Sequence, residues 1–493
     1  MTTATLRAQA AQTAPGVDAE SRIRLSEVIA SLSCALDITE GQPEGHAART
    51  ALIGMRLAEE IGLDHAEREP LFYALLLKDL GCSSNAAKMS YLFGADDQRL
   101  KRDVKTIDWP KMKESARYLV SHALPDARPW ERAMRVISLA LQGSKGPRQL
   151  VETRCERGAS IARSLGFPEG TAIAIRQLDE HWNGKGHPDG LRHEEISIGA
   201  RIANLAQTVE VFWRERGIQA AVQIARDRRK RWFDPALVDA FVTLHEEASF
   251  WEQLTTSDPT AAVAKLAPED DIHYIDEGEL DRIAEAFAQV VDAKSPWTFK
   301  HSAGVARIAS GIAATIGFDA EDVRRVRRMG LLHDLGKLGV SNLILDKPGK
   351  LTAEEFDALR AHPADSERIL ERIACFANYA PLAGAHHERI DGRGYFRGVP
   401  SRDLPLAARI LTVADIFEAL TAARPYRDGM PREKALAILQ KDAGKAVCTL
   451  AVEGLLAYLK REEVESRVED QLRSLDSLLN ELSGEHQVPL RPA

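Results

Sequence analysis

The sequence predicts an all-α protein that consists of two related helical bundles in tandem. Apolar residues recur at helical spacing through Leu25, Val28, Ile29 and Leu32, and again within 52–61, which gives each helix one apolar face. Few stretches alternate with the period of two that is typical of a strand. Blocks of the first half also align with blocks of the second half at constant offsets. An internal repeat of this kind indicates two copies of one fold.

The helices of the second half carry recognisable end signals. Ser295 and Pro296 form an N-cap and first-turn pair. Thr352 and Glu355 form a capping box, and Pro363 is expected to end the helix that they begin. The pattern predicts helices over 277–292 and 322–332, a helix that carries Phe356, Leu359 and His362, a helix that carries Asp415 after Leu404-Pro405, and an amphipathic helix over 461–482.

Composition describes an ordinary soluble chain. The 493 residues are 44% hydrophobic and 28% charged, which is enough for two to four domains. A net charge of −8 gives no general attraction to a nucleic acid duplex or an anionic membrane, so a local cluster of Arg and Lys must hold any anionic ligand. No apolar run approaches the ~20 residues of a membrane span. The five scattered cysteines do not form a disulfide pattern, and we expect a cytoplasmic protein.

Histidine and aspartate occur in the second half where core packing does not explain them. His386 and His387 are followed by an acidic residue and then by three glycines within seven residues, although glycine weakens regular structure and paired histidines pack poorly. His333 and Asp334 lie in an apolar run, and so does Asp415. A buried charge is costly unless it is paired or binds a metal.

The number of these residues indicates more than one metal ion. Five histidines and two embedded aspartates are too many for one tetrahedral zinc, and they suit two adjacent metals with nitrogen and oxygen ligands. The absence of cysteine from the set argues against a structural zinc. The candidate metal ligands are His301, His333, Asp334, His362, His386, His387 and Asp415.

The second half resembles the HD-GYP phosphodiesterases, a branch of the HD superfamily of metal-dependent phosphohydrolases. The resemblance covers about residues 275–450, and Phe396 stands where the family has the proline of its Gly-Tyr-Pro motif. The motifs, in the family's order, are His333-Asp334-x-Gly336-Lys337, His386-His387-Glu388-x-x-Asp391-Gly392-x-Gly394-Tyr395, Asp415 and Arg424-Pro425-Tyr426-Arg427.

The resemblance implies an enzyme that hydrolyses a cyclic dinucleotide, with cyclic di-GMP as the expected substrate and pGpG or GMP as product. It implies two divalent metal ions, iron or manganese first, while zinc, magnesium, nickel and cobalt are also compatible. By resemblance, His301, His333, Asp334 and Asp415 would hold one metal, and His362, His386 and His387 would hold the other. Asp334 would bridge the metals, Lys337 would neutralise the scissile phosphate, and Tyr395, Arg424 and Arg427 would orient the nucleotide.

Two other functions stay open at this point. The protein could be a phosphohydrolase of the wider HD superfamily that acts on another nucleotide. It could also be a signalling scaffold whose second half binds a nucleotide with little turnover, although the complete ligand set argues against this.

The first half repeats the motif positions but has lost most of the candidate ligands. An offset of 255 aligns His46 with His301, and Asp79 with Asp334. An offset of 208 aligns the later glycines. We therefore expect a degenerate HD-GYP-like copy that binds no metal pair, because a lysine beside the aspartate would repel a cation. The substitutions are Lys78 for His333, Cys82 for Lys337, Arg154 for His362, Leu178 for His386, Asp179 for His387 and Gln207 for Asp415.

These patterns give the expected domain organisation. The first copy is expected to be regulatory or structural, and a homodimer or a protein partner could use it as a contact. The expected units are a disordered tail over 1–20, the degenerate copy over 21–255 with an insertion at about 85–150, a linker over 256–276, the catalytic domain over 277–460, and an amphipathic helix and tail over 461–493.

Overall fold

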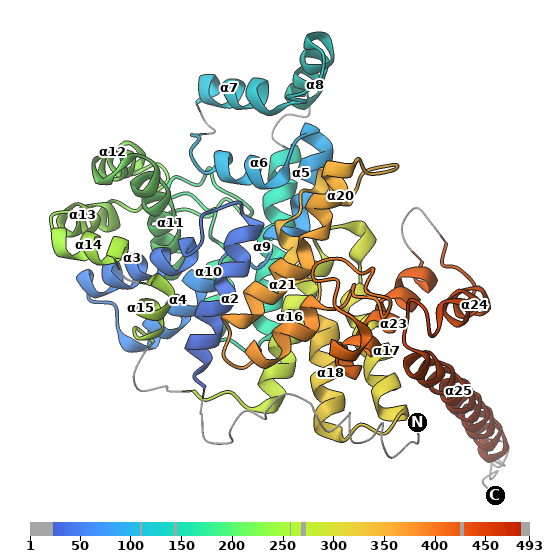
Figure 1. Ribbon diagram of the computed structural model, residues 1–493. Coiled ribbons are helices and arrows are strands. Elements are labelled where there is room, and N and C mark those ends of the chain that lie inside the picture. The colour runs from blue at the N-terminus through green and yellow to red at the C-terminus, as the bar shows by residue number, and fades with distance from the viewer. Residues whose placement is uncertain are drawn as a thin grey trace, which may run out of the picture.

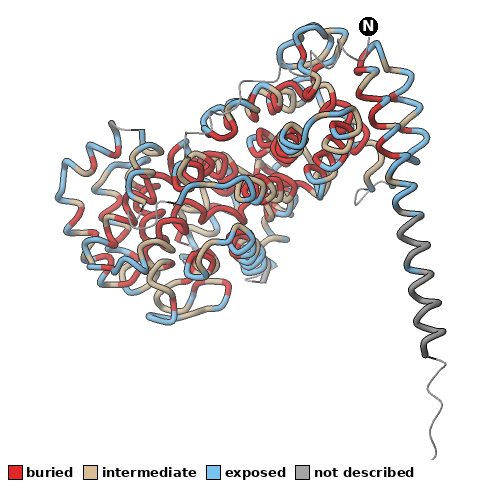
Figure 2. Tube along the Cα trace, turned by 90° about the horizontal axis from the view of Figure 1, so that it is seen from below, coloured by how far each residue is buried: buried red, intermediate tan, exposed pale blue. Residues whose placement is uncertain are grey.

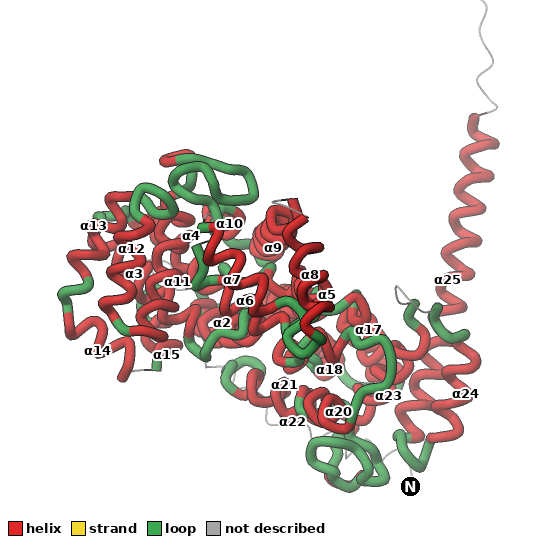
Figure 3. The backbone as a smooth tube through the Cα atoms, turned by 90° about the horizontal axis from the view of Figure 1, so that it is seen from above, coloured by secondary structure: helices red, strands yellow, loops and turns green. Residues whose placement is uncertain are grey.

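The computed structural model describes residues 23–108, 111–141, 145–256, 258–267, 273–423 and 428–484. Within these ranges the backbone forms helices and loops and no β-strand (Figure 3). Its extended pairings are isolated bridges, such as the one between Arg24 and Tyr274. The expected all-α fold class is confirmed. None of the helices in these ranges is long and apolar enough to cross a membrane.

The first half runs from blue to green in Figure 1. Its helices are α2 (Leu25–Thr39), α3 (His46–Glu60), α4 (His65–Leu77), η1 (Cys82–Asn85), α5 (Ala86–Phe93), α6 (Asp97–Val104), α7 (Met112–His122), α8 (Pro129–Leu141), α9 (Lys145–Ser164), α10 (Glu169–Arg176), η2 (His193–Glu195), α11 (Ile198–Arg216), α12 (Ile218–Arg228), α13 (Pro235–Leu244), α14 (Ala248–Thr256) and α15 (Pro259–Ala264).

The second half runs from yellow to red in Figure 1. Its helices are α16 (Glu277–Asp292), η4 (Pro296–Thr298), α17 (His301–Thr315), α18 (Ala320–Leu332), η5 (Leu335–Gly339), α19 (Asn342–Leu345), α20 (Ala353–Arg360), α21 (His362–Glu371), η6 (Ala377–Tyr379), α22 (Ala380–Gly384), η7 (Ser401–Asp403), α23 (Leu406–Thr421), α24 (Arg432–Asp442) and α25 (Thr449–Gly484).

The repeat in the sequence is also a repeat of structure. Helices α3 and α4 have the same bounds as α17 and α18 when 255 is added to each number. The close approach between the glycine of η5 and the helix that carries His362 also occurs twice. A Cβ on Gly336 would lie 2.0 Å from the carbonyl oxygen of His362, and a Cβ on Gly81 would lie 1.9 Å from that of Arg154. Both copies therefore require glycine at this crossing.

The two halves pack against each other reciprocally. Helix α2 of the first half contacts η5 and α21 of the second, and α16 of the second half contacts η1 and α9 of the first. The largest apolar core includes Val28 of α2, Phe287 of α16 and Leu335 of η5, and Figure 2 shows buried segments throughout the body. Burial of apolar surface from both halves holds the junction together.

The insertion supplies helix α6, which lies at this junction. The buried carboxylate of Asp97 accepts a hydrogen bond from Nζ of Lys294 at 3.0 Å and another from the backbone N–H of Asn342 at 3.0 Å. The amide of Gln98 donates to the carbonyl of Leu338 at 2.8 Å. Helix α6 therefore contacts the chain directly beside Lys337. Helices α7 and α8 stand away from the body at the top of Figure 1.

Two expected helix boundaries are wrong. Pro363 does not end the helix that Thr352 and Glu355 cap: α20 ends at Arg360, and Pro363 lies in the first turn of the next helix, α21, which His362 begins. A proline is tolerated there because the first turn leaves N–H groups without intrahelical partners. The C-terminal helix begins at Thr449 rather than at 461 and extends away from the body (Figures 1 and 2). The expected capping box itself is confirmed.

Candidate metal centre

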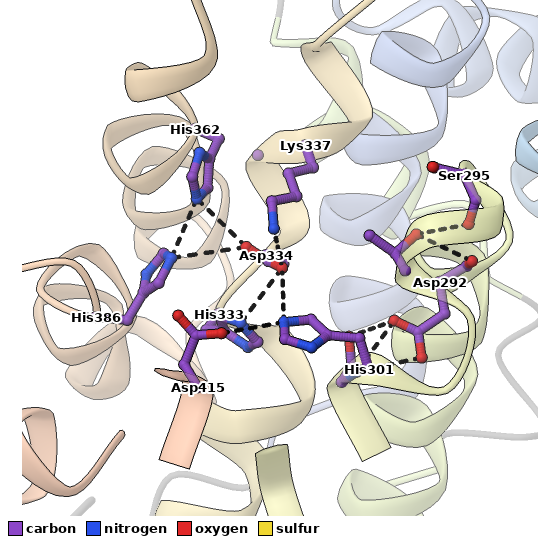
Figure 4. A network of polar contacts seen from close by, with 12 residues as sticks. Asp292, Ser295, His301, His333, Asp334, Lys337, His362, His386 and Asp415 are labelled. Atoms are coloured by element: carbon purple, nitrogen blue, oxygen red, sulfur yellow. Dashed lines mark hydrogen bonds and ion pairs between the residues drawn. The ribbon is translucent and has the colours of Figure 1, made fainter. Parts of the chain in front are cut away.

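The carboxylate of Asp334 lies at the centre of the candidate site, between α18 and η5 (Figure 4). Its Oδ2 lies 3.4 Å from Nε2 of His301, 3.3 Å from Nε2 of His333 and 2.5 Å from Nζ of Lys337. All of these side chains except that of Lys337 are buried. Asp334 therefore faces several nitrogen atoms at once, as a shared ligand would.

The other oxygen of Asp334 faces a second group of histidines. Its Oδ1 lies 3.3 Å from Nε2 of His362 and 3.6 Å from Nε2 of His386. His387 lies beyond this pair, with its Nδ1 3.7 Å from Oδ2 of Asp415. Helices α17, α18, α21 and α23 and the segment after α22 thus bring the residues together from separate parts of the chain.

All seven expected ligands fall into groups that could hold metal ions. Ligand atoms within 4.8 Å of one another come from His362, His386 and His387 in one group, from His301, His333 and Asp415 in a second, and from His333, Asp334 and His386 in a third. The third group shares a residue with each of the others. The arrangement therefore matches two adjacent sites on either side of Asp334.

Four histidines are oriented by a contact at Nδ1, which directs Nε2 toward the centre. The partners of His333, His362 and His386 are carbonyl oxygens, which only accept, so Nδ1 of these three rings carries a proton and the neutral ring presents the lone pair of Nε2; the partner of His301 is a carboxylate. Anchoring of this kind is usual for metal-binding histidines. The pairs are His333 with the carbonyl of Gly330 at 2.9 Å, His362 with that of Leu359 at 2.7 Å, His386 with that of Ala383 at 2.6 Å, and His301 with the carboxylate of Glu418.

This orientation leaves lone pairs that no donor among the described residues satisfies and that a cation would satisfy. The Nε2 atoms of His362 and His386 lie 3.1 Å apart, although neither carries a proton when both Nδ1 atoms donate. Nε2 of His333 and Oδ1 of Asp334 are buried without a hydrogen-bond partner. Such atoms are costly in a protein interior. The donor set therefore fits divalent cations that accept imidazole and carboxylate ligands.

The pKa shifts of Asp334, His386 and His387 agree with this pattern, whereas burial lowers the pKa of His301 but the carboxylates of Asp334, Asp415 and Glu418 outweigh it and raise that pKa well above 6.5. Burial opposes ionisation of Asp334, but His333 and Lys337 outweigh it and hold its pKa well below the usual range. Burial and neighbouring histidines lower the pKa of His386 far below 6.5, and burial lowers the pKa of His387 to about 3. The two imidazoles are thus neutral near pH 7, the form that binds metals.

The glycine-rich segment after His387 is fixed by Glu388. Its Oε1 accepts hydrogen bonds from the backbone N–H of Arg397 at 2.7 Å and of Gly398 at 3.1 Å. A Cβ on Gly394 would lie 2.5 Å from Cα of Glu388, so only glycine fits. This places the ring of Tyr395 4.6 Å from that of His387.

The remaining sequence features of the site are the expected substrate contacts Arg424 and Arg427 and the motif position of Phe396. Arg424 and Arg427 lie outside the described residues. Phe396, at the motif's proline position, has φ of +99°, a value that proline cannot adopt because its ring fixes φ near −65°. The loop therefore has a conformation here that the motif's proline would prevent.

In the first half, the chain's own cations stand where the second half has histidines. Asp79 forms ion pairs with Lys78 and, at 3.7 Å, with Nζ of Lys105, while Arg154 pairs with Asp179. A further possible metal-binding group lies here, because a carboxylate oxygen of Glu40, a carboxylate oxygen of Asp79 and the sulfur of Cys82 lie within 4.8 Å of one another. Nζ of Lys105 lies 2.9 Å from Glu40, however, so a lysine already compensates this charge.

Sequence reasoning missed two acidic residues that orient the ligands. Glu418 contacts Nδ1 of His301 and follows Asp415 by one turn of α23, a spacing that could have indicated it. Asp292 accepts hydrogen bonds from the backbone N–H of Ser302 at 3.2 Å and from its hydroxyl at 2.6 Å. The N-terminal turn of α17, which carries His301, is fixed by these contacts.

Comparison with known proteins gives the family. A family model described as HD domain matches residues 141–237 and 285–447. The 3'3'-cGAMP-specific phosphodiesterase 3 of Vibrio cholerae is 42% identical over 447 residues, which cover 90% of this chain and 97% of that protein. A cyclic di-GMP phosphodiesterase of Thermotoga maritima is 34% identical over 186 residues, 37% of this chain and 50% of that protein.

A solved structure extends this similarity to three dimensions. A crystal structure of a cyclic GMP-AMP-specific phosphodiesterase of V. cholerae matches with a TM-score of 0.61 and 39% identity, covering 89% of this chain and 98% of that one. Both halves are therefore shared with this relative. The chain belongs to the HD-domain family of metal-binding phosphohydrolases, among its cyclic dinucleotide phosphodiesterases.

Proposed function

We propose that this protein hydrolyses 3'3'-cGAMP to a linear dinucleotide. The observation that supports this most is the match to the cGAMP-specific enzyme of V. cholerae, which includes the degenerate first half as well as the second. Hydrolysis adds the oxygen of water to phosphorus and breaks the bond between phosphorus and one ribose oxygen, which then takes up a proton.

The seven ligands would hold two divalent cations on either side of Asp334. His301, His333 and Asp415 would bind one, His362, His386 and His387 the other, and Asp334 would contact both. Bound cations of this kind supply an acidic water and compensation for phosphoryl charge. Iron or manganese is the proposed metal, because the resemblance to the HD-GYP phosphodiesterases favours these two; the imidazole and carboxylate ligands alone would also suit zinc.

Lys337 would be the chain's own contribution to binding the scissile phosphate. Its Nζ lies 2.5 Å from Oδ2 of Asp334, and Asp334 and Asp415 raise the pKa of Lys337 against the opposing effect of burial. The ammonium group is therefore charged at neutral pH. A positive charge beside the centre attracts the negative charge of a phosphodiester and so makes the free energy of binding more favourable.

Cyclic di-GMP remains the second candidate substrate. The cyclic di-GMP phosphodiesterase of T. maritima aligns with 37% of this chain. The resemblance to the HD-GYP phosphodiesterases implies cyclic di-GMP, and the similarity over 90% of this chain shifts the first choice to 3'3'-cGAMP.

The test compares the two substrates on full-length protein loaded with Mn²⁺ or with Fe²⁺ under anaerobic conditions. Linear products are separated by chromatography. We expect turnover of 3'3'-cGAMP that exceeds turnover of cyclic di-GMP and that Asp334→Asn abolishes. The matched variant Asp79→Asn changes the equivalent residue of the first half and is expected to retain turnover. Metal-loaded wild type that cleaves neither cyclic dinucleotide would overturn the proposal.

A further inference from the structure

The metal centre opens to solvent on the side of His387. The other four histidines of the centre are buried, whereas the side chain of His387 is 24% exposed and that of Lys337 is 18% exposed. A phosphodiester must therefore approach past these two residues. Any group that binds the rest of the substrate is expected beside this opening.

A row of flat side chains begins at His387 and continues to the surface. The ring of Tyr395 lies 4.6 Å from that of His387, and the ring of Phe356 on α20 lies 6.3 Å from that of Tyr395 and edge-on to it, at 69°. The guanidinium carbon of Arg360 lies 5.2 Å from the centre of the Tyr395 ring and 5.7 Å from that of Phe356. Phe356 is 45% exposed.

A single exposed phenylalanine would be unremarkable, because folded proteins expose many apolar atoms. Here the exposed ring is combined with a second ring and a guanidinium at the mouth of a metal centre. Arg360 forms an ion pair with Asp357 in which Nη1 lies 3.8 Å from Oδ1, and both side chains are exposed. Such a pair is weak, so the guanidinium is available to a ligand.

This combination matches the chemistry that binds nucleobases. Purines stack on aromatic rings and on the plane of a guanidinium group. In a nucleotide only the ribose separates the base from the phosphate, so a phosphate at the metal centre brings a base close to the opening. We propose that Phe356, Tyr395 and Arg360 form a base platform that binds one purine of the cyclic dinucleotide, an inference that rests on the proposed function.

The platform would set affinity and leave the choice between adenine and guanine to other contacts. Stacking is tolerant of base identity because every base has a π face. Loss of the Phe356 ring is therefore expected to weaken binding of 3'3'-cGAMP and cyclic di-GMP by the same factor. From the usual strength of base stacking, that factor is about 5- to 150-fold.

The experiment measures steady-state kinetics of full-length, metal-loaded Phe356→Leu and Phe356→Trp. Leucine keeps an apolar side chain without the π face, whereas tryptophan keeps the π face. We expect Phe356→Leu to raise KM for both cyclic dinucleotides. Phe356→Trp is expected to have a KM close to that of wild type. Methyl p-nitrophenyl phosphate, a phosphodiester without a base, is expected to be cleaved equally by all three proteins. Ile438→Ala on α24, where the side chain is 39% exposed, is the control for loss of a surface apolar group.

The outcomes separate the platform from the proposed function. An unchanged KM in Phe356→Leu, or an equal loss with the base-free ester, would overturn the platform, since the second result would indicate a disturbed metal centre. Wild type that cleaves the base-free ester but no cyclic dinucleotide would instead overturn the proposed function.

Discussion

Replacement of Gly336 by alanine would test how the metal centre is assembled. Gly336 belongs to η5, directly after Asp334 and Leu335, and it crosses the start of α21 where His362 lies. An added Cβ would lie 2.0 Å from the carbonyl oxygen of His362 and 2.8 Å from the backbone nitrogen of Ser366. Both are backbone atoms, so no side-chain rotation relieves the clash.

The expected magnitude follows from these distances. Real Cβ atoms essentially never approach closer than 3.0 Å, so η5 and α21 must separate by about 1 Å. Oδ1 of Asp334 and Nε2 of His362, which lie 3.3 Å apart, would move apart by a similar distance. A misplacement of about 1 Å can cost about 10²-fold in rate, and overpacking of this kind costs about 1–3 kcal/mol of stability.

The assay compares Gly336→Ala with Gly81→Ala, which introduces the same clash in the first half, 1.9 Å from the carbonyl oxygen of Arg154. Bound metal, turnover and melting temperature are measured for both. We expect similar loss of stability in the two variants, but loss of metal and about a 10²-fold fall in turnover only in Gly336→Ala. Wild-type metal content and turnover in Gly336→Ala would show that this crossing does not position the ligands.

Other contacts give three further predictions. Phe396→Gly should leave the melting temperature equal or higher, because a positive φ in a non-glycine residue costs about 1–3 kcal/mol, whereas Phe396→Pro should lower it; the reverse order would contradict the φ of +99°. Asp97→Ala should cost about 3–5 kcal/mol in denaturant unfolding, since it leaves Lys294 buried without its partner, and an unchanged midpoint would argue against this contact. Chelation should abolish turnover and lower the melting temperature, both restored by Mn²⁺ in wild type but not in Asp334→Asn.

The candidate metal ligands could be identified from sequence because their chemistry is unusual where it occurs. Imidazoles and carboxylates inside an apolar run are costly unless they are paired or bind a metal, and the structure brings all seven expected ligands together. Glu418 was missed because a glutamate on a helix is ordinary without knowledge of its neighbour. Its contact with His301 joins residues that are 117 positions apart, so the spacing from Asp415 places Glu418 on the same face of α23 but does not identify its partner.

The helix boundaries were less predictable for a similar reason. Pro363 fits both the end of one helix and the start of the next, and local sequence does not distinguish them. The position of α6 at the junction of the two halves could not be predicted from sequence either, because Asp97 and Lys294 come together only when both halves are folded. The repeat itself was predictable because glycines such as Gly81 and Gly336 are required by close backbone contacts.

The second half is expected to bind two metal ions beside Asp334, and the first half is expected to bind none. Anomalous diffraction from crystals of the full-length, Mn²⁺-loaded protein measures this difference directly. We predict two peaks, one among His301, His333 and Asp415 and one among His362, His386 and His387. A peak beside Asp79, or the absence of peaks beside Asp334, would contradict this assignment.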